Sequence, residues 1–103
     1  MSRVILKYEL DPTSGGQHAI PEGSFFLALQ MQGYVPVMWW SVPAEPDFPN
    51  RWPLRTFLIA PTGPPGYSDD CHYVGTFQIG GFVGHVLSHV PIALSAGSDG
   101  EDR

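Results

Sequence analysis

The stretch YVGTFQIGGFVGHV, residues Tyr73 to Val86, decides the fold class of this chain. Two runs rich in β-branched and aromatic residues flank Gly80-Gly81, and this pattern predicts an antiparallel hairpin with a two-residue turn. The predicted cross-strand pairs are Ile79 with Phe82, Gln78 with Val83, Phe77 with Gly84, and Thr76 with His85. The chain is therefore expected to build its sheets from hairpins.

The two faces of this hairpin differ in chemistry because side chains alternate along a strand. The apolar face carries Phe77, Ile79, Phe82 and Val86, and the polar face carries Thr76, Gln78 and His85. Thr76 beside His85 could act as a nucleophile and its base, although cross-strand hydrogen bonding is the commoner use of such a pair. The polar face is therefore either a working site or the solvated side of a strand.

The rest of the chain also favours strands. Eleven prolines and twelve glycines among 103 residues leave few windows for a long helix. Strand patterns cover Arg3 to Leu10, the segment FFLALQMQGYVPVMWWSV from Phe25 to Val42, and Thr56 to Ala60. These patterns predict a mainly β domain, a small antiparallel sandwich or partly open barrel of about five to six strands.

The segment from Phe25 to Val42 predicts a second hairpin, with its turn at Gln32-Gly33. Met31 then faces Tyr34, Ala28 faces Val37 and Phe26 faces Trp39, which leaves both faces largely apolar. Such a ribbon is either enclosed within the domain or covered by another chain. We therefore expect an oligomeric interface at Trp39 or Trp40, with burial of both tryptophans in the core as the alternative. Proline cannot donate a hydrogen bond to a ladder, which predicts that the strand of Pro36 lies near an edge or a bulge.

Composition limits the classes of function. Only 15% of the residues are charged, which favours a homo-oligomer, and the net charge of -5 disfavours binding to nucleic acid. No apolar run approaches the roughly 20 residues of a membrane-spanning helix, and no signal peptide is evident. With a single cysteine, Cys71, the sequence predicts an intracellular domain over residues 1–94 and a disordered acidic tail over residues 95–103.

A proline-rich loop from Pro43 to Pro53 brings Arg51 and Trp52 near Arg55 in the sequence. Arginine beside aromatic rings suits a stacked or anionic ligand. The alternative is a surface loop held in place by its aromatic residues.

Motifs for catalysis, metals or phosphate are missing. The chain lacks the nucleophile motif GxSxG, and His72, His85 and His89 lack the spacing of a metal site. The segment Pro61-Thr62-Gly63 lacks the lysine of a phosphate-binding loop. The sequence therefore predicts a non-enzymatic protein without metal or cofactor.

The order of several segments resembles a family of small, largely uncharacterised proteins encoded by tailed bacteriophages and prophages. The segments are ILKYEL, IPEG, ALQMQGYVPVMWW, RTFLIAPTGPP and YVGTFQIGGFVGHV, and the similarity covers about residues 3 to 89. The resemblance implies a phage-encoded protein in the host bacterial cytoplasm, and it brings no established catalytic residues. The proline-rich loop and the acidic tail depart from the shorter members of that family.

These observations lead to one functional hypothesis and one alternative. The hypothesis is a phage accessory protein, oligomeric and non-enzymatic, that sequesters a small host ligand such as a nucleotide immune signal. In it, Trp39, Trp52 and Tyr73 stack a base, Arg51 and Arg55 neutralise phosphate, and Thr76, Gln78 and His85 donate or accept hydrogen bonds. The alternative is a protein-binding inhibitor or small structural factor that docks through its tryptophan-bearing hairpin.

Overall fold

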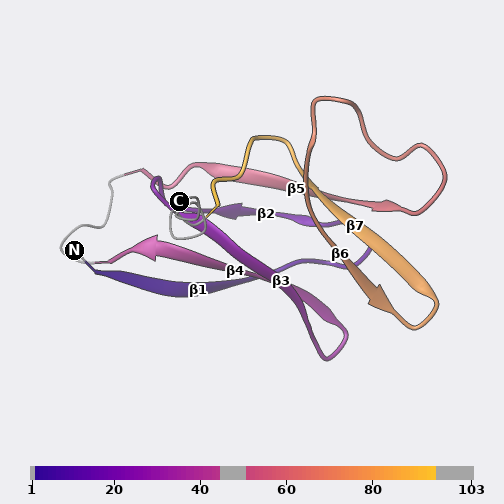
Figure 1. Ribbon diagram of the computed structural model, residues 1–103, viewed down its shortest axis with the longest axis horizontal. Helices are drawn as coiled ribbons and strands as arrows, with labels where there is room; N and C mark the ends of the chain where they lie inside the picture. Colours follow the sequence, from indigo (N-terminus) through magenta and orange to yellow (C-terminus); the bar gives the residue numbers. More distant parts are fainter. Residues whose placement is uncertain (1, 45–50, 95–103) are drawn as a thin grey trace, which may run out of the picture.

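Seven strands in two antiparallel sheets make up the fold (Figure 1), in a computed structural model that describes residues 2–44 and 51–94. The strands are β1 (Arg3–Glu9), β2 (Gly16–Ala19), β3 (Phe25–Gln32), β4 (Val35–Pro43), β5 (Leu54–Pro61), β6 (His72–Ile79) and β7 (Phe82–Ser88). The first sheet has the order β1-β4-β3 and the second β2-β5-β7-β6. The mainly β, antiparallel class is confirmed, and the two sheets form an open sandwich.

One strand more than predicted is present because β2 forms in a segment for which the sequence analysis predicted no strand. Gln17 and His18 of β2 lie opposite Thr56 and Arg55 of β5. The turn before β2 is tight: the Asp11 N–H donates to the Gly15 carbonyl at 2.8 Å, and Gly15 has a φ of 79°. A side chain at Gly15 would overlap the backbone of Phe57, so this position requires glycine.

The hairpin of β6 and β7 has the predicted register. Thr76 lies opposite His85, Phe77 opposite Gly84, Gln78 opposite Val83, and Ile79 opposite Phe82. Phe77 and Val86 are buried in the core, which places the apolar face inward. The polar face of this hairpin therefore points away from the core.

The turn of the β3–β4 hairpin lies one residue later than predicted, which shifts the cross-strand partners by two residues. Gln32 pairs with Val35, so the turn is Gly33-Tyr34 rather than Gln32-Gly33. Gly33 has a φ of 65°, and Gly80 takes the same place in the other hairpin with a φ of 58°. In a type II′ turn only the first central residue needs a positive φ. Gly33 is the residue that tolerates it, so the turn forms with Gly33 in the first central position. A bulge at Leu27 then pairs Phe26 with Trp40 instead of Trp39.

The core between the sheets is built around Trp40. This side chain has 0% exposure, and its ring meets Phe26 edge-on with centroids 5.6 Å apart. The second sheet contributes Phe57, Phe77 and Val86 to the same cluster. The expected interface role of Trp40 is therefore wrong for this fold, because its side chain fills the core, which was the alternative considered.

Pro36 lies on β4, the central strand of its sheet, so the edge alternative of the prediction is wrong, whereas β4 does pair with β3 across a bulge. The Leu10 N–H donates to the Pro36 carbonyl at 2.9 Å, one position beyond the end of β1 at Glu9. The N–H that proline lacks is therefore missing only at the end of the ladder, where its loss costs little.

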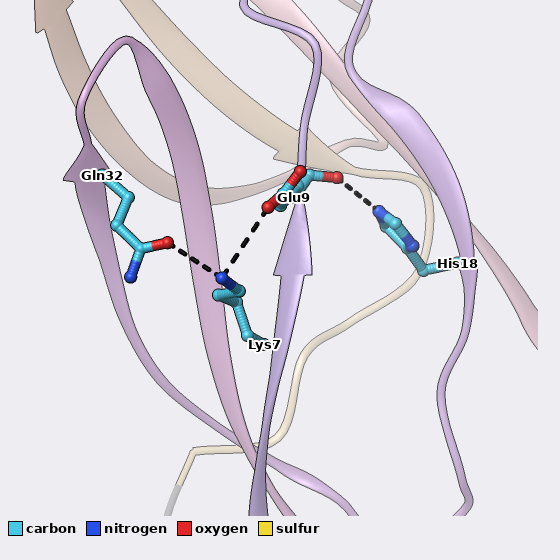
Figure 2. A network of polar contacts seen from close by, with 4 residues as sticks. All are labelled: Lys7, Glu9, His18 and Gln32. Atoms are coloured by element: carbon cyan, nitrogen blue, oxygen red, sulfur yellow. Dashed lines mark hydrogen bonds and ion pairs between the residues drawn. The ribbon is translucent and has the colours of Figure 1, made fainter.

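Polar side chains cross the outer face of the first sheet (Figure 2). Lys7 of β1 donates to Gln32 Oε1 of β3 at 2.9 Å and forms an ion pair with Glu9 at 3.7 Å. The Lys7–Gln32 bond passes over the central strand near Val37, which has 0% exposure although it is outside the core cluster. This part of the outer face is therefore covered by polar groups.

The predicted acidic tail, residues 95–103, lies outside the described residues, as does part of the proline-rich loop, residues 45–50. Within the described part of the chain no helix has the length and apolarity needed to cross a membrane.

We predict that Gly84→Ala lowers the free energy of unfolding by about 1–3 kcal/mol. A Cβ at Gly84 would lie 2.5 Å from Phe77 Cζ and 2.9 Å from Phe82 Cε2, and Phe77 cannot yield because it is buried in the core. Gly81→Ala is the matched control, since a Cβ there meets nothing within 4 Å. Urea unfolding followed by tryptophan fluorescence measures both variants, and equal stabilities would contradict the packing role of Gly84.

Candidate functional site

His85 occupies the centre of the outer face of the second sheet. It lies on β7, between Ala60 of β5 and Thr76 of β6. Because Val86 is buried in the core, the His85 side chain projects to the other side of the sheet. Two neighbouring strands therefore place groups beside this imidazole.

Both ring nitrogens of His85 bond to threonine hydroxyls. Nδ1 lies 2.8 Å from Thr76 Oγ1, and Nε2 lies 2.6 Å from Thr62 Oγ1. The Tyr73 hydroxyl bonds in turn to Thr76 Oγ1, and the rings of Tyr73 and His85 have centroids 6.2 Å apart. We call the side chains of Tyr73, Thr76, His85 and Thr62 the His85 network.

Tyr73 joins this network because of a bulge in β6. Strict alternation would place Tyr73 on the same side as Gly75 and Phe77, which faces the core. The register shifts between Tyr73 and Gly75, so that Tyr73 lies opposite Leu87 and shares the outer face with Thr76. A bulge of this kind re-aims a side chain, and here it gives the site one of its two aromatic rings.

A pocket opens beside His85, under the loop that follows β5. Its volume is about 420 Å³, within the usual range for a small-molecule site. The lining residues are Ala60, Pro61, Thr62, Gly63, Pro64, Tyr67, Tyr73 and His85. The loop packs closely on the strand end, since a Cβ at Gly66 would lie 3.0 Å from Ala60 Cβ. The Thr62–His85 hydrogen bond therefore ties this loop to the sheet.

The pocket beside His85 carries no carboxylate, ammonium or guanidinium group. Its lining includes no Asp, Glu, Lys or Arg. A threonine hydroxyl can donate or accept, so the His85 network can satisfy either tautomer and also the protonated ring. Further along the same loop, the Ser68 hydroxyl bonds to the Asp70 carboxylate and lowers the pKa of Asp70 below its usual range. The lack of Asp, Glu, Lys and Arg in the lining, together with the hydroxyl groups of the His85 network, suits hydrogen bonding to an uncharged ligand.

The predicted arginines lie away from the His85 network. Arg55 is at the start of β5 opposite His18, whereas Ala60 near its end lies beside His85. Five residues of strand separate these positions by about 17 Å. Arg55 also lies over the Trp40 ring at 5.6 Å, toward the core side of the sheet. Arg51 is exposed and forms an ion pair with Glu22 at 3.3 Å. The structure therefore divides the predicted site into two separate regions.

The remaining predicted residues also lie outside the pocket lining. Trp52 is 39% exposed and follows Arg51 on the approach to β5. Gln78 shares the polar face with Thr76 but donates to the Gly80 carbonyl of its own turn at 3.2 Å. Trp39 lies on the outer face of the other sheet, opposite Lys7 and Ala28.

Sequence reasoning missed Thr62 and Tyr67 as site residues. Both lie in the segment PTGPPGY, of which only Pro61-Thr62-Gly63 was considered, as a phosphate-binding loop. A strand that ends in a Pro- and Gly-rich turn indicates a loop that can fold back. Nothing in the sequence shows which strand face that loop covers.

A second and larger pocket, of about 530 Å³, lies between β6 and the final described segment. Its lining includes Phe26, Cys71, His72, Pro91, Ile92 and Leu94, and Tyr73 borders both pockets. The hydrogen bonds that organise the His85 network have no counterpart there. Within the described ranges, His, Cys, Asp and Glu side chains form no group of three or more that could hold a metal ion.

Comparison with known proteins identifies the family but no described relative. No curated protein and no solved structure matches the chain. The family model of a domain of unknown function, DUF7352, matches residues 1–93, which include every strand of both sheets and the whole His85 network. The chain therefore belongs to the DUF7352 family.

Proposed function

We propose that this domain binds a small, planar, uncharged molecule in the His85 pocket and does not transform it. The observation that carries the proposal is the His85 network, which holds an imidazole and three hydroxyl groups in fixed positions at a preformed pocket. A few convergent polar groups in a concave site are typical of ligand recognition. A nucleobase or a similar heterocycle has the matching chemistry.

Aromatic rings at the pocket support a planar ligand. Tyr67 and Tyr73 are each 58% exposed, although each ring could bury more apolar surface. Tyrosine rings bind flat molecules by stacking, and each stacked base contributes about 1–3 kcal/mol. The Thr62 hydroxyl lines the pocket and keeps acceptor capacity beyond its bond to His85, so it can also bond to a ligand edge.

The absence of charge in the pocket lining decides against phosphate as the recognised group. Phosphate binding normally uses Arg, Lys or backbone N–H groups at a helix end. Arg51 and Arg55 lie elsewhere, so of the residues in the sequence hypothesis the site at this pocket keeps Tyr73, Thr76 and His85. Sequestration of a nucleotide immune signal, with a phage origin and a place in the host cytoplasm, stays a prediction from the sequence and the resemblance.

The hydrogen bonding at His85 favours binding over catalysis. A threonine nucleophile needs a base that is itself oriented by a third group, usually a carboxylate. Nε2 of His85 meets the Thr62 hydroxyl instead, at 2.6 Å. We therefore assign His85 to the organisation of the pocket.

Adenosine is expected to bind with backbone amide shifts at the end of β5, on β7 and in the loop that follows β5. Adenosine monophosphate should bind no more tightly, because no cationic side chain lines the pocket. His85→Ala should weaken adenosine binding about tenfold or more, since it removes the bonds that position both threonines. NMR titration of the full chain measures all three effects.

The control for this titration is Gln78→Ala, which alters the same sheet face outside the pocket and should leave binding unchanged. Tighter binding of the monophosphate with shifts around Arg51 and Arg55 would contradict the proposal. Recovery of a converted nucleoside after incubation would instead show catalysis.

Thr62→Val should free the loop after β5, because it deletes the hydroxyl that bonds to His85 Nε2. We expect amide hydrogen exchange to rise at least about fivefold for residues 62–67 while the strands stay protected. Thr62→Ser keeps a hydroxyl and should exchange like the unmodified protein. Equal exchange in the valine and serine variants would show that the Thr62–His85 bond does not hold the loop.

A second candidate function is docking to another protein through the outer face of the first sheet. Trp39 is half-buried there, and Ile5 on the same face is 63% exposed. An apolar surface with a central tryptophan is typical of a protein contact. Trp40 takes no part, because it is buried in the core.

The variant Trp39→Asp separates the two functions, because Trp39 is remote from the pocket. It should leave the adenosine-induced shifts unchanged while removing an apolar anchor from the docking face. Loss of those shifts in a folded Trp39→Asp protein would contradict the separation of the two surfaces.

A further inference from the structure

Strand β1 is an exposed edge strand whose protection is limited to its charged side chains and to His18, which bonds to the Glu9 carbonyl at one end. It lies at the end of the order β1-β4-β3, is seven residues long and has a continuous register with β4. Val4 and Ile5 are 39% and 63% exposed. A long, regular and partly apolar edge strand is a template for another strand, and natural proteins usually protect such edges.

The other three edge strands of the described structure have such protection. β3 has a bulge at Leu27, and its Phe26 N–H already donates to the Ala93 carbonyl at 2.7 Å. β6 has a bulge beside Tyr73, and a Cβ at its Gly75 would lie 3.0 Å from Leu29 of the first sheet. β2 has only four residues. Among these edges β1 is the long one without a bulge.

The hydrogen bonds at the end of β1 show which backbone groups point outward. The Leu10 N–H bonds to Pro36 beyond the end of β4, so alternate residues Tyr8, Leu6 and Val4 also face β4. The Glu9 carbonyl points the other way and accepts a 2.6 Å bond from His18 Nε2 (Figure 2). The N–H and C=O groups of Arg3, Ile5 and Lys7 therefore face the free edge.

We propose that two copies of this chain pair edge to edge through β1, in an antiparallel register centred on Leu6. Ile5 then lies opposite the partner's Lys7, and the two residues exchange both ladder hydrogen bonds. The two-fold axis repeats this pair on the other side of Leu6. The two first sheets become one continuous sheet.

Charge selects this register over its neighbour. Centred on Leu6, the pairing brings Arg3 opposite the partner's Glu9, a pair of opposite charge that occurs twice. To reach that carboxylate, the Arg3 side chain exchanges its hydrogen bonds to Ser41 and to the Gly23 carbonyl within its own copy. Centred on Ile5, it would bring Arg3 opposite the partner's Lys7, and like charges directly opposite are destabilising. The sequence of β1 is therefore self-complementary in the register centred on Leu6 and not in the neighbouring register centred on Ile5.

The same register covers exposed apolar surface. Val4 lies opposite the partner's Tyr8 on the core side, and the apolar stem of the partner's Lys7 lies beside Ile5 on the outer side. Because only 15% of the chain is charged, cover of such surface by a second copy is consistent with its composition.

The test is the dimer dissociation constant, measured by sedimentation equilibrium of the full chain with a concentration series. The unmodified protein should show a monomer–dimer equilibrium. Ile5→Lys should weaken the dimer about tenfold or more, because it places a lysine opposite the partner's Lys7 twice. Leu54→Lys is the matched control: Leu54 is 64% exposed, and the same substitution on β5 should leave the dimer unchanged.

The register is tested by charge reversal. Arg3→Glu and Glu9→Arg should each weaken the dimer, and the double variant Arg3→Glu/Glu9→Arg should recover it because the attractive pair is restored. Circular dichroism verifies that each variant is folded. A monomer at all concentrations, equal effects of Ile5→Lys and Leu54→Lys, or no recovery in the double variant would overturn the proposal.

Discussion

The packing of Trp40 between the two sheets is the constraint on which the rest of the fold depends. Its ring meets Phe26 of its own sheet and belongs to one buried cluster with Phe57, Phe77 and Val86 of the other. The indole N–H is buried without an acceptor among the described residues, a cost of about 1–3 kcal/mol. The burial of so large an apolar ring outweighs this cost, since an aromatic side chain buries about 150–250 Å².

The position of the candidate site follows from that core. Once Phe77 and Val86 face inward, strict alternation sends Thr76 and His85 to the outer face of the second sheet. A bulge adds Tyr73 to that face, and the loop after β5 supplies Thr62. The site therefore needs two irregular features, a bulge and a returning loop, on an otherwise regular sheet. Irregular elements on a rigid scaffold are where binding residues are commonly placed.

The parts of the structure that the sequence predicted depend on local rules. The hairpin around Gly80-Gly81 was predicted with every cross-strand pair correct, because a glycine pair between two apolar runs permits one short turn. The turn of the second hairpin was predicted one residue too early, because Gln32-Gly33 and Gly33-Tyr34 both contain the glycine that marks a turn. Turn geometry decides between them, since positive φ belongs at the first position and only Gly33 tolerates it there.

The parts that were not predicted depend on long-range contacts. Arg51 and Arg55 are near Trp52 in sequence, yet β5 carries Arg55 and the His85 pocket at opposite ends. Thr62 meets His85 across 23 positions of the chain, and no periodic pattern records such a contact. Strand β2 escaped prediction because Gly16-Gln17-His18-Ala19 is a poor strand sequence that is held by its pairing with β5.

The two outer surfaces of the sandwich offer separate opportunities for recognition. The second sheet carries the pocket with its imidazole and hydroxyl groups, and the first sheet carries the free edge of β1 and the half-buried Trp39. The core lies between them, so pairing of two copies through β1 adds strands to the first sheet without contact at the pocket. Each copy would therefore keep its own pocket, and a dimer would present two equivalent sites whose ligand affinity does not require the partner. Two linked sites gain avidity only toward a ligand that spans both. A small planar ligand cannot do so, and the two proposals taken together therefore imply a binding stoichiometry of one ligand per chain.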